Sequence, residues 1–234
     1  MKNLVTIATH NGREPLDRLF KSIKQFDPGV VNFDILICDI KSDDWGDYKD
    51  YLSEKSQEIE EEIGVRTFIS RALHNGYETE AILFSYKNYV NYDNYLFIHD
   101  STEVKQNNWA QLFFDRLNEC DVCAWLGFNF HFCLFEEEPY LRQLFGKLML
   151  PEYGILGSMF ACKRSALDEV NMCGLMPPPS ECKMHAQAME RGWACIFKMA
   201  GLKVDFIAKG GTTPEELLSF PILNKYIYAR GNNA

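Results

Sequence analysis

The stretch LVTIATHNGREPLDRLFKSI, residues 4–23, decides the fold class. Residues 4–8 form a short apolar run that favours a β-strand, and the polar group Thr9-His10-Asn11-Gly12 ends it. Apolar residues then recur every three or four positions over residues 16–26, and Pro15 stands where the first turn of a helix tolerates proline. We therefore predict a buried strand, a polar turn and an amphipathic helix.

The same unit of strand, polar turn and helix recurs through the first half of the chain. Apolar runs at residues 33–38, 65–69 and 95–98 predict three more strands, and helical patterns at residues 45–63, 81–90 and 109–117 predict three more helices. Strands that alternate with helices favour a parallel sheet with crossover helices. Because the runs are nearly all apolar, we expect both faces of the sheet to be buried.

The second half of the chain has a less regular pattern. We expect strands at residues 122–130, 157–162 and 203–207, a helix opened by a capping box at Ser165 and Asp168, a helix capped by Ser180 that runs to Arg191 and ends at Gly192, and a helix with a tail at residues 214–228. The acidic run at residues 136–138 is expected to be a solvated loop. No repeat or linker is visible in the sequence, so we predict a single α/β domain over residues 1–234.

The composition excludes several classes of function. A formal net charge of -9 disfavours nucleic acid and anionic membrane surfaces as partners, because both attract Lys and Arg. No apolar run approaches the roughly 20 residues that span a bilayer. The eight cysteines show no disulfide framework, and the lone Cys120–Cys123 pair lacks the further ligands of a zinc site. Reduced thiols indicate a cytoplasmic location. The sequence contains no Gly-rich dinucleotide motif, P-loop or serine-hydrolase motif.

Polar residues follow each of the first four predicted strands, at the edge where parallel sheets bind ligands. They are Thr9, His10, Asn11, Asp39, Arg71, His74, Asn75, His99, Asp100 and Ser101. Asp39 offers a carboxylate to a nucleobase or a ribose, or alternatively it caps a turn. His99 and Asp100 suit a divalent metal or a diphosphate, or alternatively the turn before the next helix. Arg71 and Lys41 balance phosphate charge, or alternatively they are surface cations.

Glu181 is the remaining candidate for chemistry. It follows three successive prolines, at the first turn of a predicted helix. A carboxylate at this place acts as a general base, or it only interacts favourably with the positive end of the helix dipole. The residues alone leave both interpretations open.

Six stretches, taken in chain order, resemble the GT-A-fold glycosyltransferases similar to glycosyltransferase family 2. They are the opening stretch, DILICDIKSDD (34–44), HNGYETEAI (74–82), YLFIHDST (95–102), GILGSMFACKRSALDEV (154–170) and SECKMHAQAMERGWACIF (180–197). The resemblance covers roughly residues 1–207. It implies a Rossmann-like, mostly parallel central sheet flanked by helices, with residues 1–105 as the nucleotide-sugar-binding half. Residues 106–234 would form the acceptor-side half and a C-terminal helix.

The resemblance also implies an activity and a set of site residues. A sugar would move from a UDP- or GDP-sugar to a hydroxyl of a glycan or another acceptor, with inversion and with help from Mn²⁺ or Mg²⁺. Glu181 would take the acceptor proton. The nucleotide sugar would lie against Thr9, His10, Asn11, Asp39, Arg71, Asn75 and Asp100, and the metal against His99 and Asp100. The family's D-x-D metal motif is His99-Asp100-Ser101 here, so only its middle position is acidic.

Two other functions stay open at this point. A metal-dependent hydrolase would use the strand-end residues His10, His74, His99 and Asp100. A catalytically silent GT-A-fold protein would bind a sugar nucleotide without transferring the sugar, and the missing acids of the D-x-D motif favour it.

Overall fold

A mixed sheet forms the centre of the molecule in the computed structural model, which describes residues 1–132, 134–210 and 223–225. Among these residues, eight strands pair in the order β3-β2-β1-β4-β8-β6-β7, with β9 beside β6. The strands are β1 (Asn3–Thr9), β2 (Phe33–Asp39), β3 (Thr67–Arg71), β4 (Asn94–His99), β6 (Val122–Asn129), β7 (Tyr153–Ile155), β8 (Phe160–Lys163) and β9 (Val204–Lys209). Only β7 and β8 run against the others. The predicted mostly parallel sheet is therefore confirmed.

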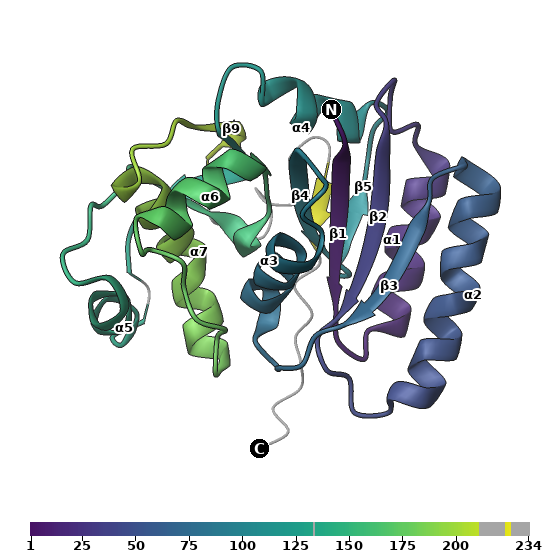
Figure 1. Cartoon of the computed structure of the whole chain (residues 1–234), viewed down its shortest axis with the longest axis horizontal. Helices are drawn as coiled ribbons and strands as arrows, with labels where there is room; N and C mark the ends of the chain where they lie inside the picture. The colour runs from purple at the N-terminus through teal and green to yellow at the C-terminus, as the bar shows by residue number, and fades with distance from the viewer. Residues whose placement is uncertain (133, 211–222, 226–234) are drawn as a thin grey trace.

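Helices cover both faces of this sheet (Figure 1). They are α1 (Arg13–Gln25), α2 (Trp45–Ile63), α3 (Tyr77–Asn88), α4 (Trp109–Arg116), α5 (Glu137–Phe145), α6 (Arg164–Met172) and α7 (Lys183–Met199), with a 3₁₀ turn at Leu156–Ser158. Side chains alternate along β1, so Val5 and Ile7 pack in the core under α1, α2 and α4. Leu4 and Ala8 pack in the second core, under α3, α6 and α7. Both faces are buried, as the apolar runs predict.

The helix α2 has the bounds that the sequence predicts. Its buried residues Tyr48, Leu52 and Ile59 face the core at helical spacing. Gly64 follows in the left-handed conformation, with φ of 67°, and its N–H bonds to the carbonyl of Glu60. Glycine adopts this conformation without the steric cost of a Cβ, which explains why the helix stops there.

The predicted end and cap of the helix after the prolines are wrong. Gly192 lies inside α7, where a Cβ would stand 2.9 Å from the Leu141 side chain of α5. The glycine therefore permits close packing of two helices and does not end one. Ser180 does not cap α7, which begins after Cys182. The Ser180 hydroxyl donates to Thr79 Oγ1 at 3.3 Å, which ties the entry of α7 to α3.

The predicted capping box is also absent from α6. This helix begins at Arg164, so Ser165 already lies in its first turn, and no side chain caps it. Asp168 instead accepts a 3.0 Å hydrogen bond from the Tyr86 hydroxyl of α3. A contact between two helices replaces the local one that the spacing predicts.

The acidic run at residues 136–138 is not a solvated loop. Glu137 begins α5, is 1% exposed and pairs with Arg191 of α7 at 3.4 Å. The Arg191 guanidinium also donates to the His131 carbonyl and lies 4.8 Å from the centre of the Phe128 ring. A buried cation with these partners explains why an acid is buried at this position.

We predict that Glu137→Gln lowers the free energy of unfolding by about 2–4 kcal/mol, because it leaves the buried Arg191 charge without its counterion. Glu136→Gln is the matched control, since Glu136 is exposed and precedes α5. It should change stability by less than about 1 kcal/mol. Urea unfolding monitored by circular dichroism measures both variants. Equal effects of the two substitutions would contradict the assignment.

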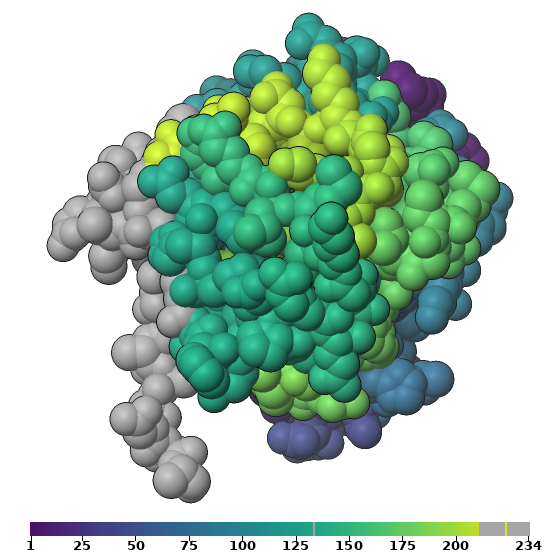
Figure 2. All heavy atoms as spheres, turned by 90° about the vertical axis from the view of Figure 1, so that its left-hand side faces the viewer, coloured from purple at the N-terminus to yellow at the C-terminus, as the bar shows by residue number. Residues whose placement is uncertain are grey.

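The C-terminal part of the chain is described only at residues 223–225. The helix expected over residues 214–228 otherwise lies outside the described residues. Leu223–Lys225 is the strand β10, which pairs antiparallel with β5 (Thr102–Val104). Figure 2 turns α5 and its neighbours towards the viewer and shows that segments of the second half form almost all of this side. Within the described residues, no helix combines the length and the apolar character needed to cross a membrane.

Candidate active site at the strand ends

The sheet register brings the ends of β1, β2 and β4 to one level. Thr9 pairs with Asp39 on one side of β1, and Ala8 pairs with His99 on the other. Asp100 follows β4 directly. The polar residues predicted at these three strand ends therefore lie along one edge of the sheet, the carboxyl edge, where ligands bind in α/β proteins.

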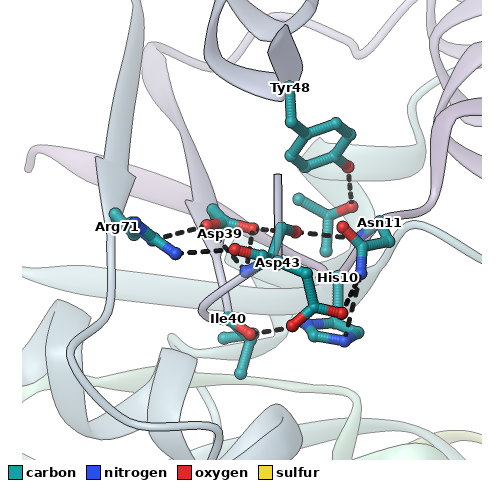
Figure 3. A network of polar contacts seen from close by, with 9 residues as sticks. His10, Asn11, Asp39, Ile40, Asp43, Tyr48 and Arg71 are labelled. Carbon is teal, nitrogen blue, oxygen red and sulfur yellow. Dashed lines mark hydrogen bonds and ion pairs between the residues drawn. The ribbon is translucent and has the colours of Figure 1, made fainter. Parts of the chain in front are cut away.

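Asp39 is a buried carboxylate that organises the turn after β2. It is 0% exposed, and its two oxygens accept hydrogen bonds from the Ser42 backbone N–H at 3.2 and 3.1 Å and from the Ser42 hydroxyl. Arg71 Nε lies 3.3 Å from Asp39 Oδ2, and Arg71 Nη2 donates to the Ser42 carbonyl at 2.6 Å. The guanidinium also lies 5.0 Å from the Trp45 ring centre. Figure 3 shows this network.

The turn after β1 is tied to the same loop. The Asn11 backbone N–H donates to Ser42 Oγ at 2.8 Å, and Asn11 adopts a φ of 52° that asparagine tolerates better than most residues. His10 Nδ1 lies 2.7 Å from the Ile40 carbonyl oxygen. Asn11 Nδ2 reaches Asp43 at 3.5 Å (Figure 3). Two loops distant in sequence thus form one polar surface.

Asp100 lies at the other end of this edge in a crowded place. Its Oδ2 accepts a 2.9 Å hydrogen bond from Thr9 Oγ1, which lies 2.6 Å from the Tyr48 hydroxyl. A Cβ on Gly12 would overlap the same carboxylate oxygen, so a larger residue there would displace the Asp100 side chain. Burial raises the pKa of Asp100 to about 6, although the Thr9 hydroxyl and the backbone N–H groups of His10 and Ser101 favour its charged form.

His99 points away from Asp100. Adjacent residues of a strand project to opposite faces. Asp100 meets β1 and α2 through Thr9 and Tyr48, whereas His99 Nδ1 lies 3.5 Å from Glu78 Oε1 of α3. The predicted metal pair of His99 and Asp100 is therefore not brought together. Asp100 alone fits a divalent ion whose other ligands are phosphate and water oxygens, an arrangement that Mg²⁺ commonly adopts.

The described residues contain no group of three His, Cys, Asp or Glu side chains that could hold a metal. His10 lies against the Ile40 carbonyl, His74 is exposed, and His99 faces α3. The three histidines of the hydrolase hypothesis therefore do not converge on Asp100. The observed arrangement gives that hypothesis no support.

Glu181 lies in the loop that leads into α7. It is exposed, and its backbone N–H donates to His185 Nδ1 at 3.4 Å. The His185 ring stacks on Tyr140 at 3.8 Å with an interplanar angle of 8°. Pro179, two residues earlier, packs where a Cβ on Gly76 would be, 2.7 Å away. The loop that carries Glu181 therefore lies beside the first turn of α3, on the His99 side of the sheet.

Sequence reasoning missed several residues of this edge and misplaced others. Tyr48 belongs to an apolar helical stripe and gives no sign in the sequence of its bond to Thr9. Glu78 lies in a helix start with two acids, where a dipole role is the ordinary interpretation. Asn75 is exposed beside this edge, and Lys41 is exposed with a left-handed φ of 52°.

This architecture is the GT-A fold. The sequence matches no protein-family model and no curated protein. Solved structures with the same fold include S. aureus TarS 1-349, with a TM-score of 0.56 and 12% identity over 96% of this chain and 60% of that chain. The structure of the same protein in complex with UDP has a TM-score of 0.56 and 14% identity, over 92% of this chain and 62% of that chain.

A second glycosyltransferase, GalNAc-T7 with UDP, GalNAc and Mn²⁺, has a TM-score of 0.54 and 18% identity. That alignment covers 88% of this chain and 42% of GalNAc-T7. The chain thus spans less than two thirds of each of these proteins. At such low identity the comparisons establish the fold, and the expectation of a GT-A-type fold is confirmed.

We predict that Asp100→Asn stabilises the protein at neutral pH. The pKa of Asp100 is about 6 in the folded state and about 4 in an unfolded chain. The folded state therefore binds this proton more tightly, and stability falls as pH rises from 4 to 6. The uncharged amide avoids that loss, so the variant should gain about 1–2 kcal/mol at pH 7.5.

Urea unfolding at pH 7.5 and pH 4 measures the effect. The gain should disappear at the lower pH, where the wild-type carboxyl is largely protonated. Asp43→Asn, an exposed acid of the same edge, controls for a general change of charge. A variant that is less stable than wild type at pH 7.5 would contradict the burial argument.

Proposed function

We propose that the protein is a glycosyltransferase that moves a sugar from a nucleoside-diphosphate sugar to a hydroxyl acceptor. The donor that we propose is a UDP-sugar. The observation that carries the proposal is the alignment of Asp39, Thr9 and Asp100 along the carboxyl edge of a GT-A-fold sheet. UDP is favoured over GDP because the solved neighbours were captured with UDP or UDP-GlcNAc.

The base end of the donor would lie at Asp39. Asp39 is fully buried and bonded to Ser42 and Arg71, so it would fix the turn on which the base lies and lower the entropy cost of ordering that turn. Arg71 belongs to this end as a positioning residue for Asp39. Two strands separate β3 from β4, so Arg71 is about 14 Å from the end of β4, given a strand spacing of about 4.8 Å. Asn11, His10 and Asn75 border the same surface.

The diphosphate end would lie at Asp100. Thr9 donates to this carboxylate, Gly12 leaves room for it, and Tyr48 in turn bonds to Thr9. When Mn²⁺ or Mg²⁺ is bound, Asp100 is the residue that would hold it, and the ion supplies positive charge to the leaving diphosphate. GalNAc-T7 was solved with Mn²⁺.

The acceptor side would be the loop before α7. Glu181 is exposed there and takes the proton from the acceptor hydroxyl, so that the oxygen attacks the anomeric carbon opposite the leaving diphosphate, which gives inversion. His185 and Tyr140 hold the backbone of this loop through the Glu181 N–H and the stacked rings. These contacts hold the loop that carries Glu181, the proposed general base, in place.

A silent sugar-nucleotide-binding protein is the second candidate. The observation that favours it is the single carboxylate at the end of β4, since His99 faces α3 and Ser101 carries no charge. It shares the donor site of the first candidate and differs only in the absence of transfer or donor hydrolysis.

Isothermal titration with UDP and GDP, with and without Mn²⁺, tests the donor site. We predict that UDP binds and that Asp39→Asn weakens it by about tenfold or more, because the amide offers one acceptor oxygen to Ser42 and Arg71 where the carboxylate offers two, and the turn loosens. Asp50→Asn, at an exposed position of α2, is the control and should bind as wild type does. Thermal unfolding of each variant excludes loss of fold. Binding of no nucleoside diphosphate would refute the proposal.

Turnover of the cognate UDP-sugar separates the two candidates. We predict that Glu181→Gln lowers kcat by about 10²-fold or more while the UDP affinity is unchanged, because only the proton acceptor is lost. Glu119→Gln, an exposed acid elsewhere, should leave kcat unchanged. Full turnover by Glu181→Gln would remove the base assignment. UDP binding without donor hydrolysis or transfer by the wild type would favour the silent protein.

A further inference from the structure

A cavity lies at the opposite end of the sheet from the proposed donor site. It has a volume of about 360 Å³ and opens between the starts of β1, β2 and β3 and the loop after α3. Asn3 and Phe33 begin the strands that Thr9 and Asp39 end. Six residue steps at about 3.3 Å separate the two ends by about 20 Å. The volume is in the range of small-molecule sites.

Three aromatic rings form one wall of this cavity. The rings of Phe68 and Tyr89 are 5.7 Å apart at 60°, and those of Tyr89 and Tyr92 are 6.3 Å apart at 45°. Tilted rings make a concave apolar surface and not the parallel slot that sandwiches a planar base. The electron-rich ring faces attract the C–H groups of a puckered sugar ring.

Positive charge lines the rim of the same cavity. The Arg66 guanidinium lies 4.4 Å from the Phe68 ring centre, and neither Arg66 nor the Lys2 side chain pairs with a carboxylate among the described residues. The one acid in the lining, Asp34, accepts a 2.5 Å hydrogen bond from the Tyr92 hydroxyl. The lining therefore holds two cations and one acid, and beside it the Asp93 carboxylate accepts a 2.7 Å hydrogen bond from the Lys2 backbone N–H.

Amide groups complete the polar lining. The side chains of Asn32 and Asn91 make no hydrogen bond to other described residues. Each offers both a donor and an acceptor, the combination that a sugar hydroxyl requires. A guanidinium stacked on a ring keeps its N–H edge available, and that edge matches carboxylate or phosphate oxygens in pairs.

We propose that this cavity binds an anionic sugar, meaning a pyranose ring that carries a carboxylate or a phosphate. The rings of Phe68, Tyr89 and Tyr92 pack against the sugar, Arg66 and Lys2 bind the anionic group, and Asn32 and Asn91 bind hydroxyls. The site is separate from the donor site and does not depend on the proposed transfer reaction.

Amide chemical-shift titration of the whole chain tests the proposal with four probes: glucose 6-phosphate, glucuronate, glucose and inorganic phosphate. The two anionic sugars should shift the resonances of Arg66 and Phe68 and bind about tenfold more tightly than glucose or phosphate. Saturating UDP should leave this binding unchanged. The acidic sugar and the sugar phosphate together show which anionic group the site prefers.

Variants supply the controls. Arg66→Gln, at an exposed position, should weaken the anionic sugars about tenfold, and Arg142→Gln, an exposed arginine of α5, should not. Phe68→Leu should weaken the anionic sugars and leave phosphate unchanged. The proposal is overturned when Arg66→Gln binds as wild type does, when phosphate alone binds as tightly as glucose 6-phosphate, or when UDP competes with the sugars. Failure of UDP to bind would contradict the transferase proposal and leave the anionic-sugar proposal unaffected.

Discussion

The parallel register of β1 between β2 and β4 is the constraint on which the rest of the molecule depends. Because Thr9 pairs with Asp39 and Ala8 pairs with His99, three strand ends stop at one level. The Ile40 and Asp100 N–H groups still bond to carbonyls of β1, but N–H groups further along the loops lack strand partners and meet side chains. The Ser42 N–H binds Asp39, and the Asn11 N–H binds Ser42 Oγ. The polar side chains at the strand ends therefore bond to backbone groups that the sheet leaves without partners.

The same register divides neighbouring residues between two sides of the sheet. Asp100 joins the face of α1 and α2 through Thr9 and Tyr48, whereas His99 joins the face of α3 through Glu78. His99 and Asp100 are adjacent in the sequence and both can bind a metal. In the structure their side chains lie on opposite faces of the sheet. Of the three residues His99, Asp100 and Ser101, only Asp100 therefore offers a carboxylate on this face of the edge.

The sequence predicted the first half well because its strands and helices are set by local pattern. Apolar runs and helical stripes of β1 to β4 and α1 to α3 follow from period alone. The second half was predicted less well because tertiary contacts decide it. Glu137 is buried only because Arg191 meets it, and Gly192 permits α5 to approach instead of ending a helix. The candidate site was located from strand ends, but the Tyr48–Thr9–Asp100 chain was not, since nothing in a sequence reports which hydroxyls meet.

Charge decides what can bind at the carboxyl edge. Asp100 has a pKa of about 6, so at neutral pH it is mostly ionised although burial disfavours the charge. A diphosphate placed beside it adds like charge in a partly desolvated place, which is unfavourable unless a cation joins them. Arg71 pairs with Asp39, and two strands lie between β3, which ends at Arg71, and β4. In the proposed donor site, a divalent ion held by Asp100 would take phosphate oxygens as further ligands, so the ion and the nucleotide would each complete the other's site. Their binding should therefore be mutually cooperative, in contrast to a fold member whose acids hold the ion beforehand.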